Sequence, residues 1–319
     1  LTLDGCTVET TAAESKYIQD NNGPAASGFA VVSTDNAMDN ATPKPEGTII
    51  IKGNGSYTGL VGLGALESVK NTYTDFKDET IKVSGGTFTS AVLPEYCADG
   101  FVPTENADGT FGVKVDTSVA EVNGTKYDTL QAAVDAARRN NTIKLLRNTK
   151  ENVTISTPYV TLDLNGHTLN GSTGERKPAL TITARVTVKD SSPERTGTIM
   201  REDTAANSGT TSHYVIDIQD AGWLTFESGT VKNDSGAGGT KGASLVRVGD
   251  DSVAKYPGLN IKGGTFTQNN FIVIKVDRGD LFLNGGTLNS ANSYAVQTWH
   301  RATIKGGTVN GNVSSWTYS

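Results

Sequence analysis

Four aspartates are the residues in this sequence whose type and spacing could perform acid–base chemistry. Glycoside hydrolysis needs two carboxyl groups close together, and polysaccharide lyase chemistry needs a base beside an arginine or a Ca²⁺ ion. The four lie near the ends of short apolar segments, at Asp217, Asp220, Asp250 and Asp277. Aspartate is also a favoured turn residue, so turn formation explains the same positions without catalysis. We therefore keep them as catalytic candidates, assign no metal ligand, and leave Ca²⁺ binding open.

Aromatic side chains beside hydrogen-bond donors form a second candidate site. The candidate ligand-binding residues are Trp299, His300, Arg301, Tyr294 and Trp223. The first three place an indole, an imidazole and a guanidinium next to one another. Such groups suit a sugar ring or an aromatic-rich protein epitope. The alternative is that these aromatic rings, together with Trp316, simply cover the last repeat of the chain.

A short repeat must position these residues. It combines alternating apolar residues, a glycine pair and a threonine, and it occurs at 83–88, 260–266, 283–288 and 304–309. Its last three threonines, at positions 265, 287 and 308, are 22 and 21 residues apart. Repeats of about 20 to 50 residues indicate a solenoid or a propeller, and a propeller blade needs about 40 residues. Because glycine lets a strand turn sharply into the next one, the repeat predicts an all-β parallel β-helix.

The alternation of apolar and polar residues predicts which side chains face outward. Buried positions in one column are expected at Leu162, Leu224, Leu259, Leu281 and Ile304. An outward column is expected to contain Asn165, Glu227, Lys262, Asn284 and Lys305. Opposite charges on adjacent strands can pair across a sheet. This column is therefore predicted to be a solvated charge ladder rather than a functional site.

One short amphipathic helix is predicted at about residues 128–139, with Asp128 as its N-cap. The basic pair Arg138 and Arg139 would lie at the negative end of the helix dipole. Strands follow the helix at once, so it is expected to cover the first coil of a β-helix and protect its open edge.

Because the repeat occurs on both sides of this helix, the sequence predicts two tandem β-helices. The first is expected over residues 1–115, with a hairpin-like cap, and the second over 116–319. Polar insertions at 170–178, 201–213 and 232–243 are expected to stack on one side of the second β-helix and to wall a groove.

Composition excludes several classes of function. A net charge of −6, with mixed signs along the chain, argues against nucleic-acid binding. The only two cysteines are Cys6 and Cys97, and their spacing fits no zinc site, whereas a disulfide between them is left open. No apolar run approaches the roughly 20 residues of a membrane-spanning helix. The chain opens inside a repeat without a signal peptide, which we interpret as a fragment of a longer protein.

The segments 84–88, 96–111, 127–133 and 161–169 together resemble the repetitive cell-surface proteins of gut Gram-positive bacteria. The helix followed directly by strands resembles the N-terminal cap of pectin-lyase-like right-handed β-helix proteins. This resemblance implies a right-handed coil and a secreted or wall-attached protein that acts as an adhesin, binding module or stalk. Its expected partners are host or dietary glycans or a host cell-surface protein. The alternative that the resemblance implies is a glycoside hydrolase or polysaccharide lyase acting on complex glycans. No catalytic motif matches, so no catalytic residue is carried over.

Overall fold

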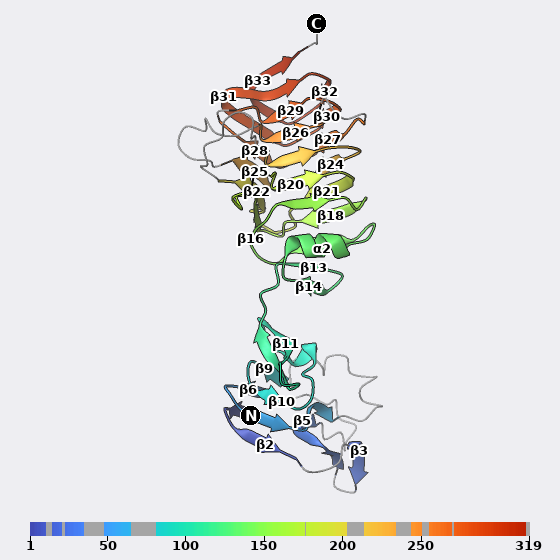
Figure 1. The fold of residues 1–319 in the computed structure, drawn as a ribbon, viewed down its shortest axis with the longest axis vertical. Coiled ribbons are helices and arrows are strands. Elements are labelled where there is room, and N and C mark those ends of the chain that lie inside the picture. The colour runs from blue at the N-terminus through green and yellow to red at the C-terminus, as the bar shows by residue number, and fades with distance from the viewer. Residues whose placement is uncertain are drawn as a thin grey trace. The chain divides into compact units, whose positions relative to one another are not determined.

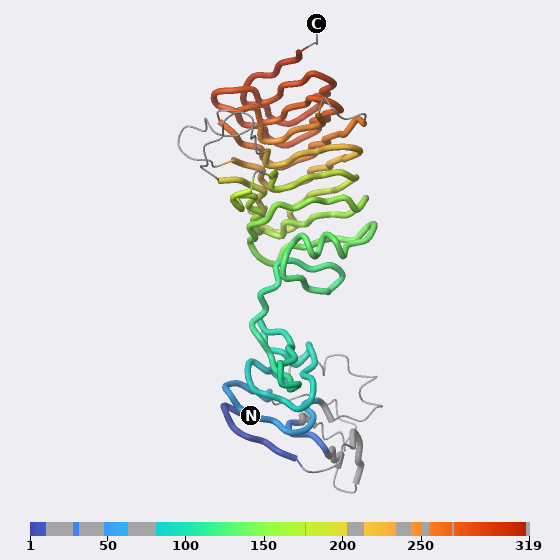
Figure 2. The backbone as a smooth tube through the Cα atoms, in the orientation of Figure 1, coloured from blue at the N-terminus to red at the C-terminus, as the bar shows by residue number. Residues whose placement is uncertain are grey.

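The computed structural model confirms the predicted all-β parallel β-helix (Figures 1 and 2). It describes residues 1–10, 15–20, 23–34, 48–64, 81–175, 177–202, 214–233, 244–250, 255–269 and 271–316. By internal contacts the chain divides into two compact units, unit 1 (Leu1–Thr117) and unit 2 (Ser118–Ser319). Each unit has its own hydrophobic core. Within the described residues, no helix is long and apolar enough to cross a membrane.

Unit 1 contains short parallel stacks followed by an antiparallel hairpin. One stack consists of β1 (Thr2–Asp4), β6 (Ile49–Lys52) and β9 (Ile81–Val83), and another of β2 (Thr7–Glu9), β7 (Ser56–Thr58) and β10 (Thr87–Phe88). Two further pairs are parallel β5 (Phe29–Thr34) with β8 (Leu60–Gly64) and antiparallel β3 (Ser15–Asp20) with β4 (Gly23–Ser27). After the 3-10 turn η2 (Pro94–Tyr96), the hairpin of β11 (Phe101–Glu105) and β12 (Phe111–Val115) joins the second stack through β10.

The core of unit 1 is built around two aromatic rings. Tyr57 and Phe88, on adjacent strands, stack with their ring centroids 4.9 Å apart. Burial and the contact of its hydroxyl with Cys6 Sγ, 3.8 Å away, raise the pKa of Tyr57 to about 12. Cys6 and Cys97 are both free thiols, so no disulfide joins them.

Unit 2 has three strands in each coil, and equivalent strands of successive coils form three parallel stacks. The first stack consists of β15 (Thr142–Leu145), β18 (Val160–Asp163), β21 (Arg185–Lys189), β24 (Trp223–Phe226), β27 (Gly258–Ile261), β30 (Asp280–Leu283) and β32 (Arg301–Ile304). The second consists of β16 (Thr149–Lys150), β19 (Thr168–Asn170), β22 (Thr198–Arg201), β25 (Thr230–Asn233), β28 (Thr265–Thr267) and the first parts of β31 (Thr287–Thr298) and β33 (Thr308–Ser315). The third consists of β17 (Val153–Ile155), β20 (Leu180–Ile182), β23 (Ile216–Ile218), β26 (Val246–Val248), β29 (Ile274–Val276) and the later parts of β31 and β33.

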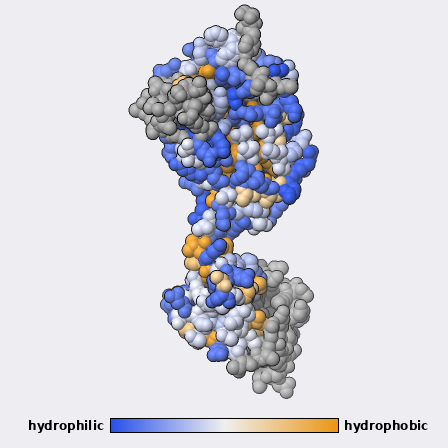
Figure 3. All heavy atoms as spheres, in the orientation of Figure 1, coloured by the Kyte–Doolittle hydropathy of each residue, from blue (hydrophilic) through white to orange (hydrophobic). Residues whose placement is uncertain are grey.

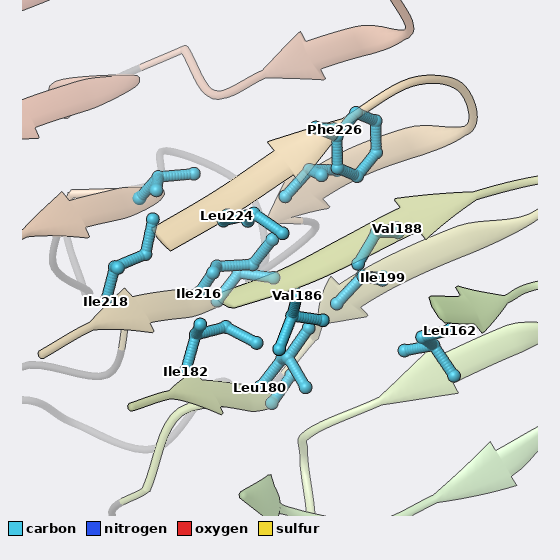
Figure 4. Packing of buried hydrophobic residues seen from close by; sticks show 14 of the residues in the cluster. Leu162, Leu180, Ile182, Val186, Val188, Ile199, Ile216, Ile218, Leu224 and Phe226 are labelled. Carbon is cyan, nitrogen blue, oxygen red and sulfur yellow. The ribbon is translucent and has the colours of Figure 1, made fainter. Parts of the chain in front are cut away.

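The core of unit 2 is a set of apolar columns that run from coil to coil (Figure 4). One column aligns Leu162, Val188, Phe226, Ile261, Leu283 and Ile304. All of them except Ile304 are fully buried. Ile304 was predicted to be buried but is 44% exposed, because β32 is the last rung of the first stack in the part of the chain that the structure describes.

The predicted register was wrong by two residues at the last coil, where it aligned Leu281 with Ile304 although Ile304 pairs with Leu283. It was also wrong by two residues at the first coil. It aligned Leu162 with Leu224, whereas Leu162 shares its column with Phe226. The reason is a longer corner between the first and second stacks. Six positions separate Leu162 from Thr168, whereas four separate Phe226 from Thr230, and these two threonines share one column of the second stack.

Aspartate side chains hold the longer corner together. Asn165, which lies there with φ 46°, donates its N–H to Asp163 Oδ1 at 3.0 Å. Asp190 accepts backbone N–H groups from Gly166 and Gly197 at 2.8 and 2.6 Å. Burial opposes the charge on Asp190, but these hydrogen bonds outweigh it and lower the pKa of the carboxyl.

The charge ladder is present with different members. On adjacent rungs it aligns Lys144, Asp163, Lys189, Glu227, Lys262, Asn284 and Lys305. Asn165 therefore lies outside the ladder, and Asp163 and Lys189 take its place. Ion pairs join Lys189 to Asp163 at 3.6 Å and Lys262 to Glu227 at 3.2 Å. The Lys262–Glu227 pair is exposed on both sides and contributes little to stability, whereas in the Lys189–Asp163 pair the carboxylate is buried.

The second glycine of the repeat explains why the motif recurs. Gly264 has φ 83°, which an L side chain rarely adopts. A Cβ at this position would also lie 2.6 Å from the Gly229 carbonyl oxygen of the previous coil. The corner therefore needs glycine for both its backbone angle and the closeness of the neighbouring coil.

The three predicted insertions leave the solenoid at the same corner, since each one connects a strand of the second stack to a strand of the third. The residues 170–178 lie between β19 and β20. Most of the other two insertions, at 203–213 and 234–243, falls outside the described residues. The predicted wall beside a groove therefore stays a prediction at these two loops.

A helix and a hairpin cover the first coil of unit 2. The helix α2 (Leu130–Ala136) is shorter than predicted, and its N-cap is Thr129 rather than Asp128, with Thr129 Oγ1 accepting the Ala132 N–H at 3.1 Å. Glu151 accepts the first two helical N–H groups, at 2.8 and 3.1 Å. At the other end, Arg138 donates to the last carbonyls of the helix. The antiparallel pair β13 (Ala120–Val122) and β14 (Thr125–Tyr127) covers β15 through β13.

The side chain of Gln131 completes the cover over the edge strand β17. Its amide nitrogen donates to the Thr154 carbonyl at 3.2 Å, and its amide oxygen accepts the Thr154 N–H at 2.8 Å. A glutamine side chain thus pairs with β17 as a neighbouring strand would. Such pairing blunts an edge that would otherwise recruit another chain.

We expect Gln131→Met to uncover this edge while keeping the helix. Loss of two partly exposed hydrogen bonds should lower the free energy of unfolding of unit 2 by about 1–2 kcal/mol. Amide hydrogen exchange at Thr154 should accelerate at the same time. Lys150→Met, on the exposed face of β16, is the control and should change neither quantity. Unchanged exchange at Thr154 in the Gln131 variant would contradict this account.

Candidate functional site

The first residues of the strands in the first stack, together with the residue just before β18, form an outward column. We call it the strand-start column, and its members on consecutive rungs are Tyr159, Arg185, Trp223, Gly258, Asp280 and Arg301. Parallel strands hold equivalent residues about 4.8 Å apart, so the column is a straight row along the solenoid. In Figure 3 the surface over β18 to β27 shows pale and apolar residues among hydrophilic ones.

Trp223 lies across the next rung because that rung carries glycine. A Cβ at Gly258 would come within 2.5 Å of the Trp223 indole, so only glycine leaves room for the ring. The indole reaches towards Phe282, with ring centroids 6.0 Å apart and a 32° angle between the planes. Arg185 lies on the other side, its Cζ 5.3 Å from the indole centroid. We name Trp223 and Phe282, on their Gly258 base, the aromatic platform.

Polar groups adjoin the aromatic platform on the next rungs. Arg301 donates to both oxygens of Asp280, at 2.8 and 2.5 Å, and this bidentate pair raises the pKa of Arg301. His300 Nδ1 lies 2.7 Å from the Gly279 carbonyl oxygen. The His300 ring also lies 5.2 Å from that of Tyr256, which is 57% exposed. Flat rings beside a fixed carboxylate and guanidinium can stack on a sugar and bond its hydroxyls.

The structure divides the five predicted ligand-binding residues between two faces. Trp223, His300 and Arg301 lie along the first stack, as just described. Trp299 lies across the corner on the third stack, where it stacks with Trp316 at 6.1 Å and faces Lys275 at 5.1 Å. Tyr294 is also on the third stack, paired with Asn312. The Trp299–Trp316 pair fits the interpretation that aromatic rings cover the last coils.

Two of the four predicted catalytic acids converge on one guanidinium. Arg247 donates to both oxygens of Asp217, at 2.9 and 2.7 Å, and to Asp250 at 2.7 Å. Gln219 also donates to Asp217 at 2.6 Å, and Asp217 is only 3% exposed. The Arg247 guanidinium lies 4.4 Å from the ring of Tyr214. Burial disfavours the charge on Arg247, but the hydrogen bonds to Asp217 raise its pKa above the usual value.

The other two acids have different surroundings. Asp277 forms an ion pair with Lys275 at 2.9 Å. Asp220 occupies a turn with φ 53°, a conformation that aspartate tolerates better than most residues. Asp277 therefore balances the charge of Lys275, and Asp220 serves the backbone turn. Among the described residues, no group of three or more His, Cys, Asp or Glu side chains is placed to hold a metal ion.

Sequence reasoning missed several members of the strand-start column. Arg185 and Gly258 were not identified, because their importance depends on which residue occupies the same position on the next rung; Tyr256, which adjoins His300 outside the column, was also not identified. The contact of Phe282 with Trp223 was not predicted either. One sequence pattern could have identified the platform. In it, an aromatic residue begins one strand and glycine occupies the same position one repeat later.

The fold and the site together define a parallel β-helix with an aromatic and charged row on its outer face. The chain matches no protein-family model, no curated protein and no solved structure.

Removing Arg247 tests whether the acid cluster is structural. Arg247→Met would leave the buried Asp217 carboxylate without its cation, and we expect the free energy of unfolding to fall by about 3–5 kcal/mol. Adding Asp217→Asn should recover part of that loss, because the uncompensated charge is removed. Urea unfolding measures both. Arg301→Met removes an exposed arginine and serves as the comparison. If Arg247→Met lowers the free energy of unfolding by no more than Arg301→Met does, the cluster does not support the fold.

Proposed function

We propose that this chain is a glycan-binding module of an extracellular bacterial surface protein, similar in build to pectin-lyase-like β-helices. The protein is secreted or attached to the cell wall, as in the gut bacteria whose surface proteins the sequence resembles. It binds host or dietary glycans as an adhesin through the first stack of unit 2. The parallel β-helix itself is compatible with such a surface role.

The observation that carries the proposal is the aromatic platform. An indole that lies along a sheet on a glycine presents a flat apolar surface at a fixed angle, and Phe282 extends it towards the next rungs. The alternating sheet gives the ring little freedom, so binding costs little conformational entropy. Asp280, Arg301 and His300 supply directional acceptors and donors beside it. This combination is what recognition of a sugar ring with polar hydroxyl groups requires.

The enzyme alternative, a glycoside hydrolase or polysaccharide lyase, receives less support. A general acid needs a carboxyl group that can hold a proton at working pH. Both oxygens of Asp217 accept hydrogen bonds from Arg247, and Asp250 shares the same guanidinium. Asp277 is likewise engaged with Lys275. A stalk without a ligand remains the simplest alternative to an adhesin, and the following experiment separates the two.

Replacing Trp223 by alanine should abolish most glycan binding. Loss of a central aromatic contact typically reduces affinity by roughly tenfold or more. A glycan array identifies ligands of the intact chain, and titration calorimetry on the best ligand measures the effect of Trp223→Ala. Trp316→Ala is the matched control, because that indole is 48% exposed but lies on the third stack.

Gly258→Ala tests the same site without removing the ring. The new methyl group would force the indole away from its seat, so this variant should weaken binding too. Absence of any glycan ligand would favour the stalk, and release of shortened products would favour the enzyme. Equal loss in the Trp223 and Trp316 variants would place binding elsewhere.

A further inference from the structure

Cations and aromatic rings alternate along the first rungs of the strand-start column and at Arg139, which lies just outside the column, next to Asn140. Arg139 lies over the ring of Tyr159, with Cζ 3.8 Å from its centroid, and Arg185 lies 5.3 Å from the centroid of Trp223. Asn140 donates its N–H to the Tyr159 carbonyl, which puts Arg139 beside the rung before Tyr159. The order along the solenoid is therefore Arg139, Tyr159, Arg185, Trp223.

The two guanidinium groups of this row are available to a ligand. In the part of the chain that the structure describes, neither Arg139 nor Arg185 forms an ion pair, and both are exposed. Each lies instead against an aromatic face, a contact that does not use the N–H groups of the guanidinium. Arg301, farther along the column, differs because Asp280 already neutralises it.

The spacing of the row sets the repeat of the ligand. Rungs are about 4.8 Å apart, so Asn140 and Arg185, two rungs apart, are separated by about 9.6 Å along the axis, and Arg139 adjoins Asn140. Tyr159 and Trp223 are two rungs apart as well. Two rungs are close to the length of one disaccharide in an extended polysaccharide. A chain lying along the column would thus bring every second sugar to an arginine and the sugars between them to a ring.

Neighbouring side chains suit such a ligand. The next outward column of the first stack contains Thr161, Thr187 and Thr225 on consecutive rungs, which offers a row of hydroxyl groups. Beyond it lies the charge ladder, in which Asp163 and Glu227 balance the lysines that pair with them. Arg139 and Arg185 add positive charge to this face that no ion pair among the described residues balances.

We propose that the row Arg139–Tyr159–Arg185–Trp223 binds an extended acidic polysaccharide that carries one carboxylate or sulfate on each disaccharide. This rests on the proposed glycan-binding function and specifies its ligand. Each guanidinium forms paired hydrogen bonds with one anionic group, and the rings pack against the sugars between. A nucleic acid fits poorly, because its charges repeat every 3.4 Å or so along each strand and the protein has a net charge of −6.

The test uses the whole chain and two oligosaccharides of equal length. A hyaluronan octasaccharide carries one carboxylate on each disaccharide, and a chitin-type octasaccharide is neutral. We expect the hyaluronan probe to bind more tightly and its binding to weaken as salt rises. Arg185→Gln should weaken hyaluronan binding by roughly tenfold or more and leave the neutral probe almost unaffected.

The control is Lys305→Gln, which removes one positive charge from another column of the same stack and should not change binding. Arg139→Gln is a second variant that should reproduce the Arg185 effect, in case loss of Arg185 disturbs the fold. Equal binding of both probes, with no effect of either arginine variant, would overturn the acidic-ligand proposal while leaving glycan binding intact. Failure of Trp223→Ala to affect any glycan would overturn the proposed function itself. Tighter binding of single-stranded DNA than of hyaluronan would reject the repeat argument.

Discussion

Direct stacking of each coil on the next is the constraint on which this structure depends. Parallel strands place equivalent residues about 4.8 Å apart, so each side chain has as its neighbours the residues one repeat before and after it. Inside, this produces continuous apolar columns such as the one from Leu162 to Leu283. At the corners it leaves no room for a Cβ, as at Gly264. On the outer surface, the same stacking places residues one repeat apart in straight rows of like or complementary side chains.

The same constraint makes the ends of the stack a problem that the sequence must solve. A coil has unpaired backbone groups on its outer edge, and an unprotected edge promotes aggregation. In unit 2 the first coil is closed by α2, by the hairpin β13–β14, and by the side-chain amide of Gln131 on Thr154. Glu151, which belongs to the first coil, in turn caps the helix. Helix and coil therefore complete each other's hydrogen bonds.

The fold could be predicted from the sequence because a period of about 21 residues with paired glycines admits few architectures. The register could not be predicted fully, because the corner after Leu162 is two residues longer than the corner after Phe226, and the motif around Asn165 resembles later copies closely enough to hide this. The helix was found from its amphipathic pattern, but its N-cap is one residue later than expected since Thr129 reaches Ala132.

The candidate site was predictable only in part, for a related reason. Trp223, His300 and Arg301 were recognisable by residue type, but their partners come from other coils. Gly258 matters because Trp223 lies over it, and Arg185 matters because it precedes Trp223 by one rung. Trp299 adjoins His300 in sequence yet lies on the third stack, because a corner separates them. Among the four predicted acids, Asp217 and Asp250 do lie close together in space. Both, however, accept hydrogen bonds from Arg247.

The central claim is that the outer face of the first stack is a ligand surface whose repeat follows the coils. A crystal structure of the chain with a hyaluronan octasaccharide tests this most directly. The account predicts a sugar chain parallel to the solenoid axis, with successive carboxylates at Arg139 and Arg185 and a ring over Trp223. A sugar chain bound at Trp299 and Trp316 on the third stack, or lying across the strands of a single coil, would contradict it.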